Sequence, residues 1–170
     1  MAKEIFVNLP VKDLKRSIEF FTKLGFTFNP KFTDEDATCM IIGENIFSML
    51  ITEKLFSKFT KKPISDASKA TEIITCISVN SREEVNEMVE AAISAGGVEY
   101  SEPQDHGWMF YRAFEDLDHH QWEVMYGDES QFPEKKQGQE YPTSFILLHL
   151  LAHLEYHLGQ INYHRRLTED

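Results

Sequence analysis

Apolar residues in the first third of the chain fall into short blocks separated by turns rich in Asp, Glu and Gly. Residues 5–11 form a nearly continuous apolar run, which predicts a strand. From Leu14 to Leu24 the apolar residues recur at helical spacing, which predicts a helix that Gly25 ends. The next apolar blocks predict three strands, over 26–28, 37–42 and 45–52. The predicted order is strand, helix, strand, strand, strand.

The second third of the chain repeats this order. Residues 72–79 predict a strand, and Ser81 followed three residues later by Glu84 is a capping-box pattern that begins a helix. A helical apolar stripe then runs to Gly96-Gly97, where the helix is expected to end. Further strands are predicted over 98–100, 108–114 and 121–126.

The two halves align along their length. When Val11 is placed on Val79, Gly25 matches Gly96 with three extra residues in the second helix. A period near 70 residues is too long for a solenoid. We therefore predict an α+β domain over residues 1–127, built from duplicated βαβββ units at 1–53 and 71–127.

The remaining segments differ in character. Residues 53–69 are polar and rich in lysine, which predicts a loop, with one helical turn, that crosses between the halves. Residues 128–143 are dominated by Gly, Ser, Pro, Gln and Lys, which is typical of a linker. Residues 144–170 show strong helical periodicity and predict a C-terminal helix.

Charge and composition narrow the class of protein. The chain has 170 residues and a net charge of −11, so we expect neither a nucleic acid nor an anionic membrane as partner. Its apolar runs are far shorter than the roughly 20 residues that span a bilayer. Residues 1–20 lack the apolar core of a signal peptide. Cys39 and Cys76 lie in apolar contexts, so we expect buried, reduced thiols and a cytoplasmic location.

The stretch from Arg112 to Tyr126 predicts a hairpin with a tight polar turn. Carboxylates in its turn, Glu-Asp-Leu-Asp-His, can bond their own backbone. Glu123 lies within the second strand, where its carboxylate either faces solvent or points into a cleft as a ligand or base. His119 and His120 cannot both join one site, because adjacent side chains in a strand point to opposite faces. We expect both to be turn residues that face solvent.

Several of these features together resemble the vicinal-oxygen-chelate superfamily, which includes glyoxalase I, bleomycin-resistance proteins, fosfomycin-resistance enzymes and extradiol dioxygenases. The resemblance covers residues 3–127. It rests on the duplicated pattern, on Asn8-Leu-Pro-Val-Lys-Asp-Leu14, and on Phe114-Glu-Asp-Leu-Asp118 followed by Trp122-Glu123. It implies curled mixed sheets around a cleft, while the functions in the superfamily are diverse.

The resemblance also implies where a metal would bind. Metal-dependent members place ligands on the first and last strand of each unit. Carried over to this chain, those positions are Phe6, Ser48, Ile74 and Glu123. Only Glu123 is a metal-type ligand, and a catalytic ion needs about three. We therefore expect a degenerate metal site and an apolar cleft suited to a hydrophobic or aromatic small molecule.

Three further residues are candidates for the cleft. His106 precedes a predicted strand and could reach the cleft mouth as an acid or base, although a solvated loop histidine is the simpler interpretation. Tyr111 and Arg112 alternate along that strand, so one of the two should face the cleft.

The tail carries a second candidate metal site. His149, His153 and His157 recur every four residues, so neighbouring pairs can chelate one ion on a helix. All three cannot share an ion, because His149 and His157 are about 12 Å apart along a helix axis. With Gly159-Gln160-Ile161, the segment resembles the last helix of DinB-like metalloproteins, whose other helices have no counterpart here.

Three hypotheses follow from the sequence. The first is that the cleft binds a small apolar or aromatic molecule, with the usual metal site degenerate and no cofactor certain. Alternatively, the chain is a metal-dependent lyase or dioxygenase acting around Glu123. A third hypothesis makes the tail a metal-binding or dimerisation module, with Zn, Ni, Mn or Fe as the candidate ion and ligands from a second chain. A leucine stripe on the tail favours a homodimer to which the tail contributes.

Overall fold

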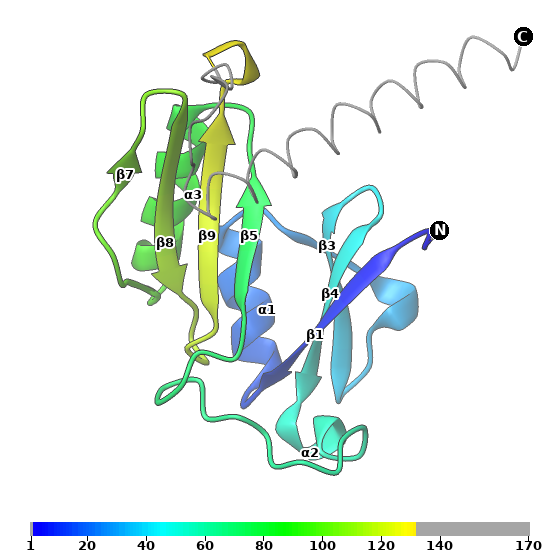
Figure 1. Ribbon diagram of the computed structural model, residues 1–170. Helices are drawn as coiled ribbons and strands as arrows, with labels where there is room; N and C mark the ends of the chain where they lie inside the picture. Colours follow the sequence, from blue (N-terminus) through cyan, green and yellow to red (C-terminus); the bar gives the residue numbers. More distant parts are fainter. Residues whose placement is uncertain (1, 132–170) are drawn as a thin grey trace, which may run out of the picture. The chain divides into compact units, whose positions relative to one another are not determined.

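Two β-sheets, each with a long helix against one face, make up residues 2–131, the part of the chain that the computed structural model describes (Figure 1). Contacts within the chain group Met1–Tyr126 as one unit and Gly127–Asp170 as another. The helix predicted over 144–170 and most of the predicted linker lie outside the described residues. No helix within residues 2–131 is long and apolar enough to cross a membrane.

The first sheet has the strand order β1-β4-β3-β2. Its outer strand β1 runs parallel to β4, with Leu9 opposite Leu50, and β3 pairs antiparallel with both β4 and β2. The elements of this unit are β1 (Ile5–Val11), α1 (Leu14–Lys23), β2 (Thr27–Asn29), a 3₁₀ turn (Pro30–Phe32), β3 (Ala37–Gly43) and β4 (Ile46–Thr52).

The second sheet repeats this arrangement with the order β5-β9-β8-β6, and a short strand β7 also pairs with β8. Its outer strand β5 again runs parallel to the last strand, β9. The predicted α+β fold with duplicated βαβββ units is therefore confirmed. The elements are β5 (Ile74–Ser78), α3 (Arg82–Ser94), β6 (Val98–Glu99), β7 (Gln104–Asp105), β8 (Met109–Glu115) and β9 (Gln121–Gly127).

Local side-chain chemistry begins and ends both long helices. The Asp13 carboxylate accepts a hydrogen bond from the first turn of α1, and the Ser81 hydroxyl does the same for α3. The Glu84 backbone N–H donates to the Ser81 hydroxyl, which confirms the predicted cap, and the Glu84 side chain accepts from the Asn80 backbone N–H one residue earlier. Gly25 and Gly96 follow the helices with φ of +94° and +106°, the left-handed conformation that a glycine adopts most easily.

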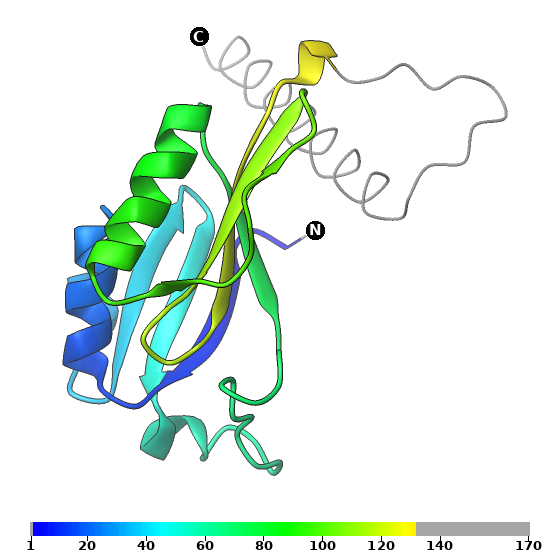
Figure 2. The same ribbon diagram turned by 90° about the vertical axis from the view of Figure 1, so that its left-hand side faces the viewer.

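Both long helices lie on the same side of the two sheets (Figure 2). Phe20 and Phe21 of α1 reach across to the second sheet, where the Phe21 ring centroid lies 5.3 Å from that of Trp122. All three are almost fully buried in one core with Val85 and Val89 of α3. A Cβ at Gly97 would lie 3.3 Å from Phe20 and 2.7 Å from the Glu115 carbonyl oxygen. The first helix therefore packs into the core of the second unit.

The turn between β8 and β9 is organised by the buried carboxylate of Asp116. One Asp116 oxygen accepts hydrogen bonds from the backbone N–H groups of Asp118 and His120, and the other accepts from the Trp122 indole at 3.0 Å. His119 takes φ +71° within this turn. The predicted closure of the hairpin by its own carboxylates is confirmed.

The same turn also links the first βαβββ unit to the second. Asp118 accepts hydrogen bonds from the Lys12 backbone N–H and the Ser17 hydroxyl, both at the start of α1. The His120 ring is 3% exposed; its Nε2 donates to the Pro10 carbonyl oxygen at 2.7 Å and its Nδ1 bonds the Glu72 carboxylate. The prediction that His120 faces solvent is wrong, because these partners satisfy both ring nitrogens inside the protein. We call the Pro10, Glu72 and His120 contacts the histidine joint.

The pKa of His120 follows from the joint. Burial by itself lowers this pKa, but the Asp116 charge, the Pro10 carbonyl and Glu72 outweigh it and raise the pKa above 6.5. The folded chain therefore binds this proton more tightly than the unfolded chain. The resulting stabilisation is complete below about pH 6.5 and is lost as the pH rises through the folded-state pKa.

Replacing the histidine should remove both the stabilisation and its pH dependence. We expect His120→Gln to lower the free energy of unfolding by about 3 kcal/mol below pH 6.5, as when one partner of a buried ion pair is lost. Denaturant titrations from pH 5.5 to 9 measure this difference, which should shrink as the pH rises. His119→Asn is the control: it removes only the partly exposed contact of the His119 ring with Glu115 and should change stability little. An equal loss at every pH would contradict a charged His120.

Candidate functional site

The face of the second sheet opposite α3 carries a group of titratable side chains. Trp122 and Val124 of β9 pack into the core beside α3, so Glu123 between them points to the other face. Cys76 lies directly opposite Glu123 in the parallel β5–β9 pairing and shares its face. Tyr111 of β8 is placed there by the same alternation. We call this surface, with Ile74, the open face.

Cys76 and Glu123 interact directly, because the Cys76 thiol donates a hydrogen bond to the Glu123 carboxylate. Cys76 is exposed at the surface, so the prediction of a buried thiol is wrong for Cys76 and right for Cys39. Restricted hydration by the surrounding protein, and then the Glu123 charge, raise the pKa of Cys76 to about 12. The thiol is therefore protonated at neutral pH and is a poor nucleophile.

Glu123 itself lies in a poorly hydrated place. Desolvation raises the pKa of its carboxyl, and the hydrogen bond from Cys76 offsets only part of that effect. Within residues 2–131 no ion pair joins it to a lysine, arginine or histidine. The carboxylate therefore has the environment of a binding group or of a proton carrier.

Two tyrosines accompany the carboxylate. The Tyr100 hydroxyl is buried with no hydrogen-bond partner in the described part of the chain. Desolvation, and then the nearby charge of Glu123, raise the pKa of Tyr100 to about 12. The pKa of Tyr111 is raised by the same two causes. The His106 ring lies 6.2 Å from the Tyr111 ring and nearly parallel to it, on an exposed side chain.

The four positions implied by the family resemblance are not equivalent in the structure. Phe6 is 46% exposed and stacks on Phe47 at 4.9 Å between ring centroids, and Ile74 is 47% exposed. Ser48 is fully buried, and its hydroxyl donates to the Val7 carbonyl oxygen. Ser48 therefore lies in the core of the first unit, where it lines no open surface.

Arg112 points away from the open face. Its guanidinium makes two hydrogen bonds to Glu99 at 2.8 and 2.9 Å, one to Asn86 of α3 and an ion pair with Glu90. Of the pair Tyr111 and Arg112, the tyrosine is thus the open-face residue. Arg112 ties β8 to α3 and to Glu99, at the end of β6.

The donor set of the open face does not fit a catalytic metal ion. Glu123 and Cys76 are adjacent, but residues 2–131 contain no group of three or more His, Cys, Asp or Glu side chains that could hold an ion. Phe6 and Ile74 offer no donor atoms. The tail histidines His149, His153 and His157 lie outside the described residues.

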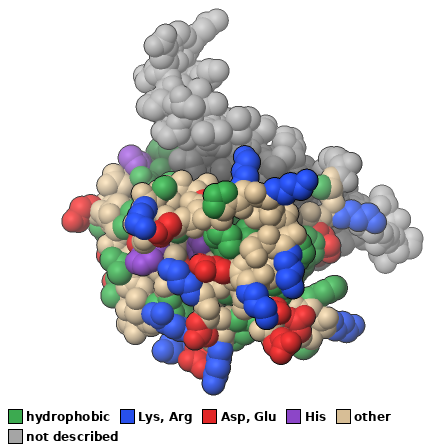
Figure 3. Space-filling model, turned by 90° about the horizontal axis from the view of Figure 1, so that it is seen from below, with side chains coloured by type: hydrophobic (Ala, Val, Ile, Leu, Met, Phe, Trp, Pro, Cys, Tyr) green, Lys and Arg blue, Asp and Glu red, His purple; other side chains and the backbone are tan. Residues whose placement is uncertain are grey.

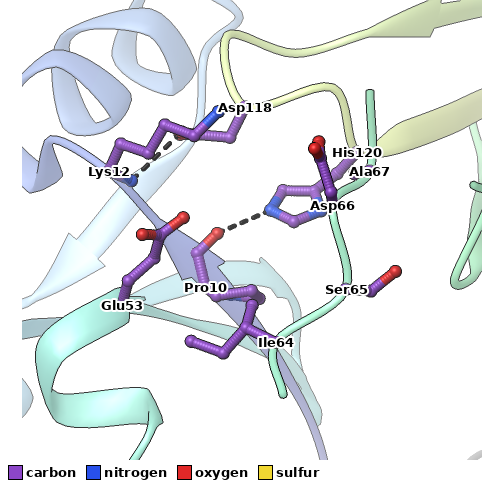
Figure 4. A pocket seen from close by; sticks show the side chains of 9 residues that line it. All are labelled: Pro10, Lys12, Glu53, Ile64, Ser65, Asp66, Ala67, Asp118 and His120. Atoms are coloured by element: carbon purple, nitrogen blue, oxygen red, sulfur yellow. Dashed lines mark hydrogen bonds between the residues drawn. The ribbon is translucent and has the colours of Figure 1, made fainter. Parts of the chain in front are cut away.

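A separate pocket of about 280 Å³ lies beside the histidine joint (Figure 4). It is lined by residues from the end of β1, the crossing loop and the β8–β9 turn: Pro10, Lys12, Glu53, Ile64, Ser65, Asp66, Ala67, Asp118 and His120. Acidic and basic side chains are interspersed over this end of the molecule, with no area of a single charge (Figure 3). The pocket is thus polar and mixed in charge.

Comparison with known proteins identifies a matching family model and solved structures with a similar fold. Residues 3–43 match the family model described as bleomycin resistance protein-like N-terminal. No curated protein sequence matches the chain. A hypothetical protein from S. aureus is similar in structure at 28% identity and a TM-score of 0.64, covering 74% of this chain and 94% of that one.

Two further solved structures carry descriptive names. A glyoxalase/bleomycin resistance protein/dioxygenase from Nocardioides has 22% identity and a TM-score of 0.59, covering 83% of this chain and 91% of that one. This chain therefore shares the fold of the glyoxalase/bleomycin resistance/dioxygenase structures. A bleomycin resistance determinant encoded on the transposon Tn5 has 19% identity and a TM-score of 0.53, covering 75% and 99%. These matches confirm the fold expected from the resemblance over residues 3–127.

Sequence reasoning missed three residues of interest. Cys76 could have been found by pairing β5 with β9 in register, because that places it opposite Glu123. The burial of His120 could have been suspected, because His120 directly precedes strand β9 rather than lying at the tip of the turn. Tyr100 had no signal, because its environment depends on three different strands.

Proposed function

We propose that the open face binds a small apolar or aromatic molecule, with Glu123 and Tyr100 as its polar anchors. The observation that carries this proposal is the Tyr100 hydroxyl, which is buried and has no hydrogen-bond partner within residues 2–131, where the nearby Glu123 carboxylate also has no counter-charge. A buried hydroxyl without a partner costs free energy that a ligand acceptor would recover. Exposed Ile74 and the ring of Tyr111 offer the apolar contact area.

Catalysis by an enediolate or oxygen-activating metal centre is the less supported alternative. The donor set at Phe6, Ile74 and Glu123 is too small for an ion, and Ser48 is buried. Cys76, with a pKa of about 12, does not supply a reactive thiolate either. Ligand binding therefore explains the open face without metal ligands or a reactive thiolate.

Indole is a suitable neutral aromatic probe for the proposal. We expect saturable binding to the full-length chain in calorimetry, with shifts in the NMR signals of the Met125 methyl group on β9. Tyr111→Ala should weaken binding about three- to tenfold, the value of one aromatic contact. Phe59→Ala, which removes an exposed aromatic ring of the crossing loop, should leave the affinity unchanged. Equal affinity of Tyr111→Ala and the unmodified chain would exclude the open face.

A homodimer is the assembly that we propose for the chain. Ile5, Phe6 and Ile46 on the first sheet are each 46% or more exposed, which is unusual for adjacent large apolar side chains. The apolar stripe that the sequence predicts for residues 144–170 would add a second apolar surface to such a dimer.

Light scattering coupled to size exclusion tests the dimer. We expect a dimer for the full-length chain and a smaller dimer fraction for Phe6→Glu, because a charge would be buried in the interface. Phe59→Glu places the same charge on an exposed ring elsewhere and should not change the mass. A monomeric full-length chain, or a dimer that Phe6→Glu leaves intact, would contradict the use of this surface.

The tail histidines support a separate metal-binding role, because i,i+4 pairs on a helix can chelate one ion. We expect elemental analysis of the purified full-length chain to show a divalent metal that His153→Ala removes and Glu123→Ala retains. Loss of metal with Glu123→Ala alone would instead locate the ion at the open face and support the enzyme alternative.

A further inference from the structure

The open face has an unbalanced charge. Its titratable groups come from every strand around Glu123: Cys76 on β5, Tyr100 after β6, Tyr111 and Glu115 on β8, and Glu123 on β9. All of these groups are neutral or negative. The positive charge of Arg112 is paired with Glu90 and Glu99 on the other side of the sheet. Two histidines nearby can carry positive charge: His119, whose ring lies 3.1 Å from the Glu115 carboxylate, and the exposed His106 beside Tyr111.

The charge of Glu123 is felt by its neighbours. Desolvation, and then the charge of Glu123, raise the pKa values of Cys76, Tyr100 and Tyr111, so these three groups are neutral at pH 7 and leave the carboxylate charge uncompensated. The pKa of Glu123 is itself raised by desolvation, and a cation would offset that cost. The electrostatic environment therefore favours a cationic guest over a neutral or anionic one.

The side chains of the open face also suit a cationic ligand. Tyrosine rings attract organic cations through their negative faces, and a carboxylate beside them adds a direct ionic partner. The Tyr100 hydroxyl, for which the described part of the chain supplies no acceptor, can donate to a neutral oxygen on the same molecule. Ile74 and Met125 share the open face and provide apolar contact for the rest of the guest.

We propose that the open face selects a cationic ligand, an organic ammonium compound with an aromatic or apolar group, and that Glu123 is the residue that sets this selectivity. This inference rests on the proposed function, because it names the chemical class of the molecule bound there. Glu123 pairs with the ammonium group, Tyr111 lies beside it, and Tyr100 donates its free hydroxyl to the ligand.

Three probes of similar size test the selectivity: benzyltrimethylammonium, benzyl alcohol and benzoate. The ammonium charge is permanent, so any pH dependence of its binding reports on the protein. At pH 8 we expect the full-length chain to bind the ammonium about tenfold more tightly than benzyl alcohol, a difference of about 1.4 kcal/mol. Benzoate should bind most weakly. Calorimetry measures the affinities, and NMR of the Met125 methyl group locates the binding.

The preference should depend on one ionised carboxyl group. As the pH falls through the pKa of Glu123, the advantage of the ammonium over benzyl alcohol should disappear. Glu123→Gln should remove that advantage at every pH, while Glu102→Gln, which neutralises an exposed carboxylate of the same unit, should retain it. Cys76 alkylation gives an independent readout: Glu123→Gln should accelerate it, by up to tenfold for each unit by which the thiol pKa falls.

Different failures point to different conclusions. If benzyl alcohol shifts the Met125 signal as strongly as the ammonium does, the open face binds ligands but does not select cations. If the preference survives Glu123→Gln, another group sets it and the assignment of Glu123 is wrong. If no probe shifts the signal, both this inference and the proposed function fail.

Discussion

The carboxylate of Asp116 is the interaction on which the rest of the structure depends. It is almost fully buried, and it accepts two backbone hydrogen bonds and one from the Trp122 indole. These bonds set the turn, and the turn sets the directions of Asp118 and His120. A buried carboxylate without these donors would cost several kcal/mol. The hairpin is therefore specified by polar bonds made inside the apolar core.

The position of Glu123 follows from that turn. It lies three positions after His120, and the alternation of β9 sends Trp122 into the core and Glu123 outward. A shift of one residue in register would reverse both side chains, placing a carboxylate in the core. The Trp122–Asp116 bond opposes such a shift, because it forms only in the observed register. The fold thus holds the carboxylate in a fixed place next to Cys76.

The duplicated order of elements, the helix caps and the hairpin closure were predictable, because each depends on residues close in sequence. The site was less predictable, because it depends on pairing between distant strands. The face of the sheet to which Ser48 points could not be predicted, because its strand is apolar at nearly every position; in the structure Ser48 faces the core. Arg112 and Tyr111 could be separated only by knowing that Glu90 and Glu99 lie on one side of β8. The burial of His120 required Pro10 and Glu72, which lie 110 and 48 positions away in the sequence.

The packing of α1 against Trp122 has a consequence for how the molecule evolved and how it folds. Although the sequence repeats, Phe20 and Phe21 of the first copy complete the interior of the second, and Gly97 leaves room for the Phe20 ring. Neither copy can therefore close its core alone. The two copies should unfold in one cooperative transition, and either half expressed separately should expose its aromatic residues and remain unfolded. The duplication is visible in the sequence, but the cooperative unit is the pair.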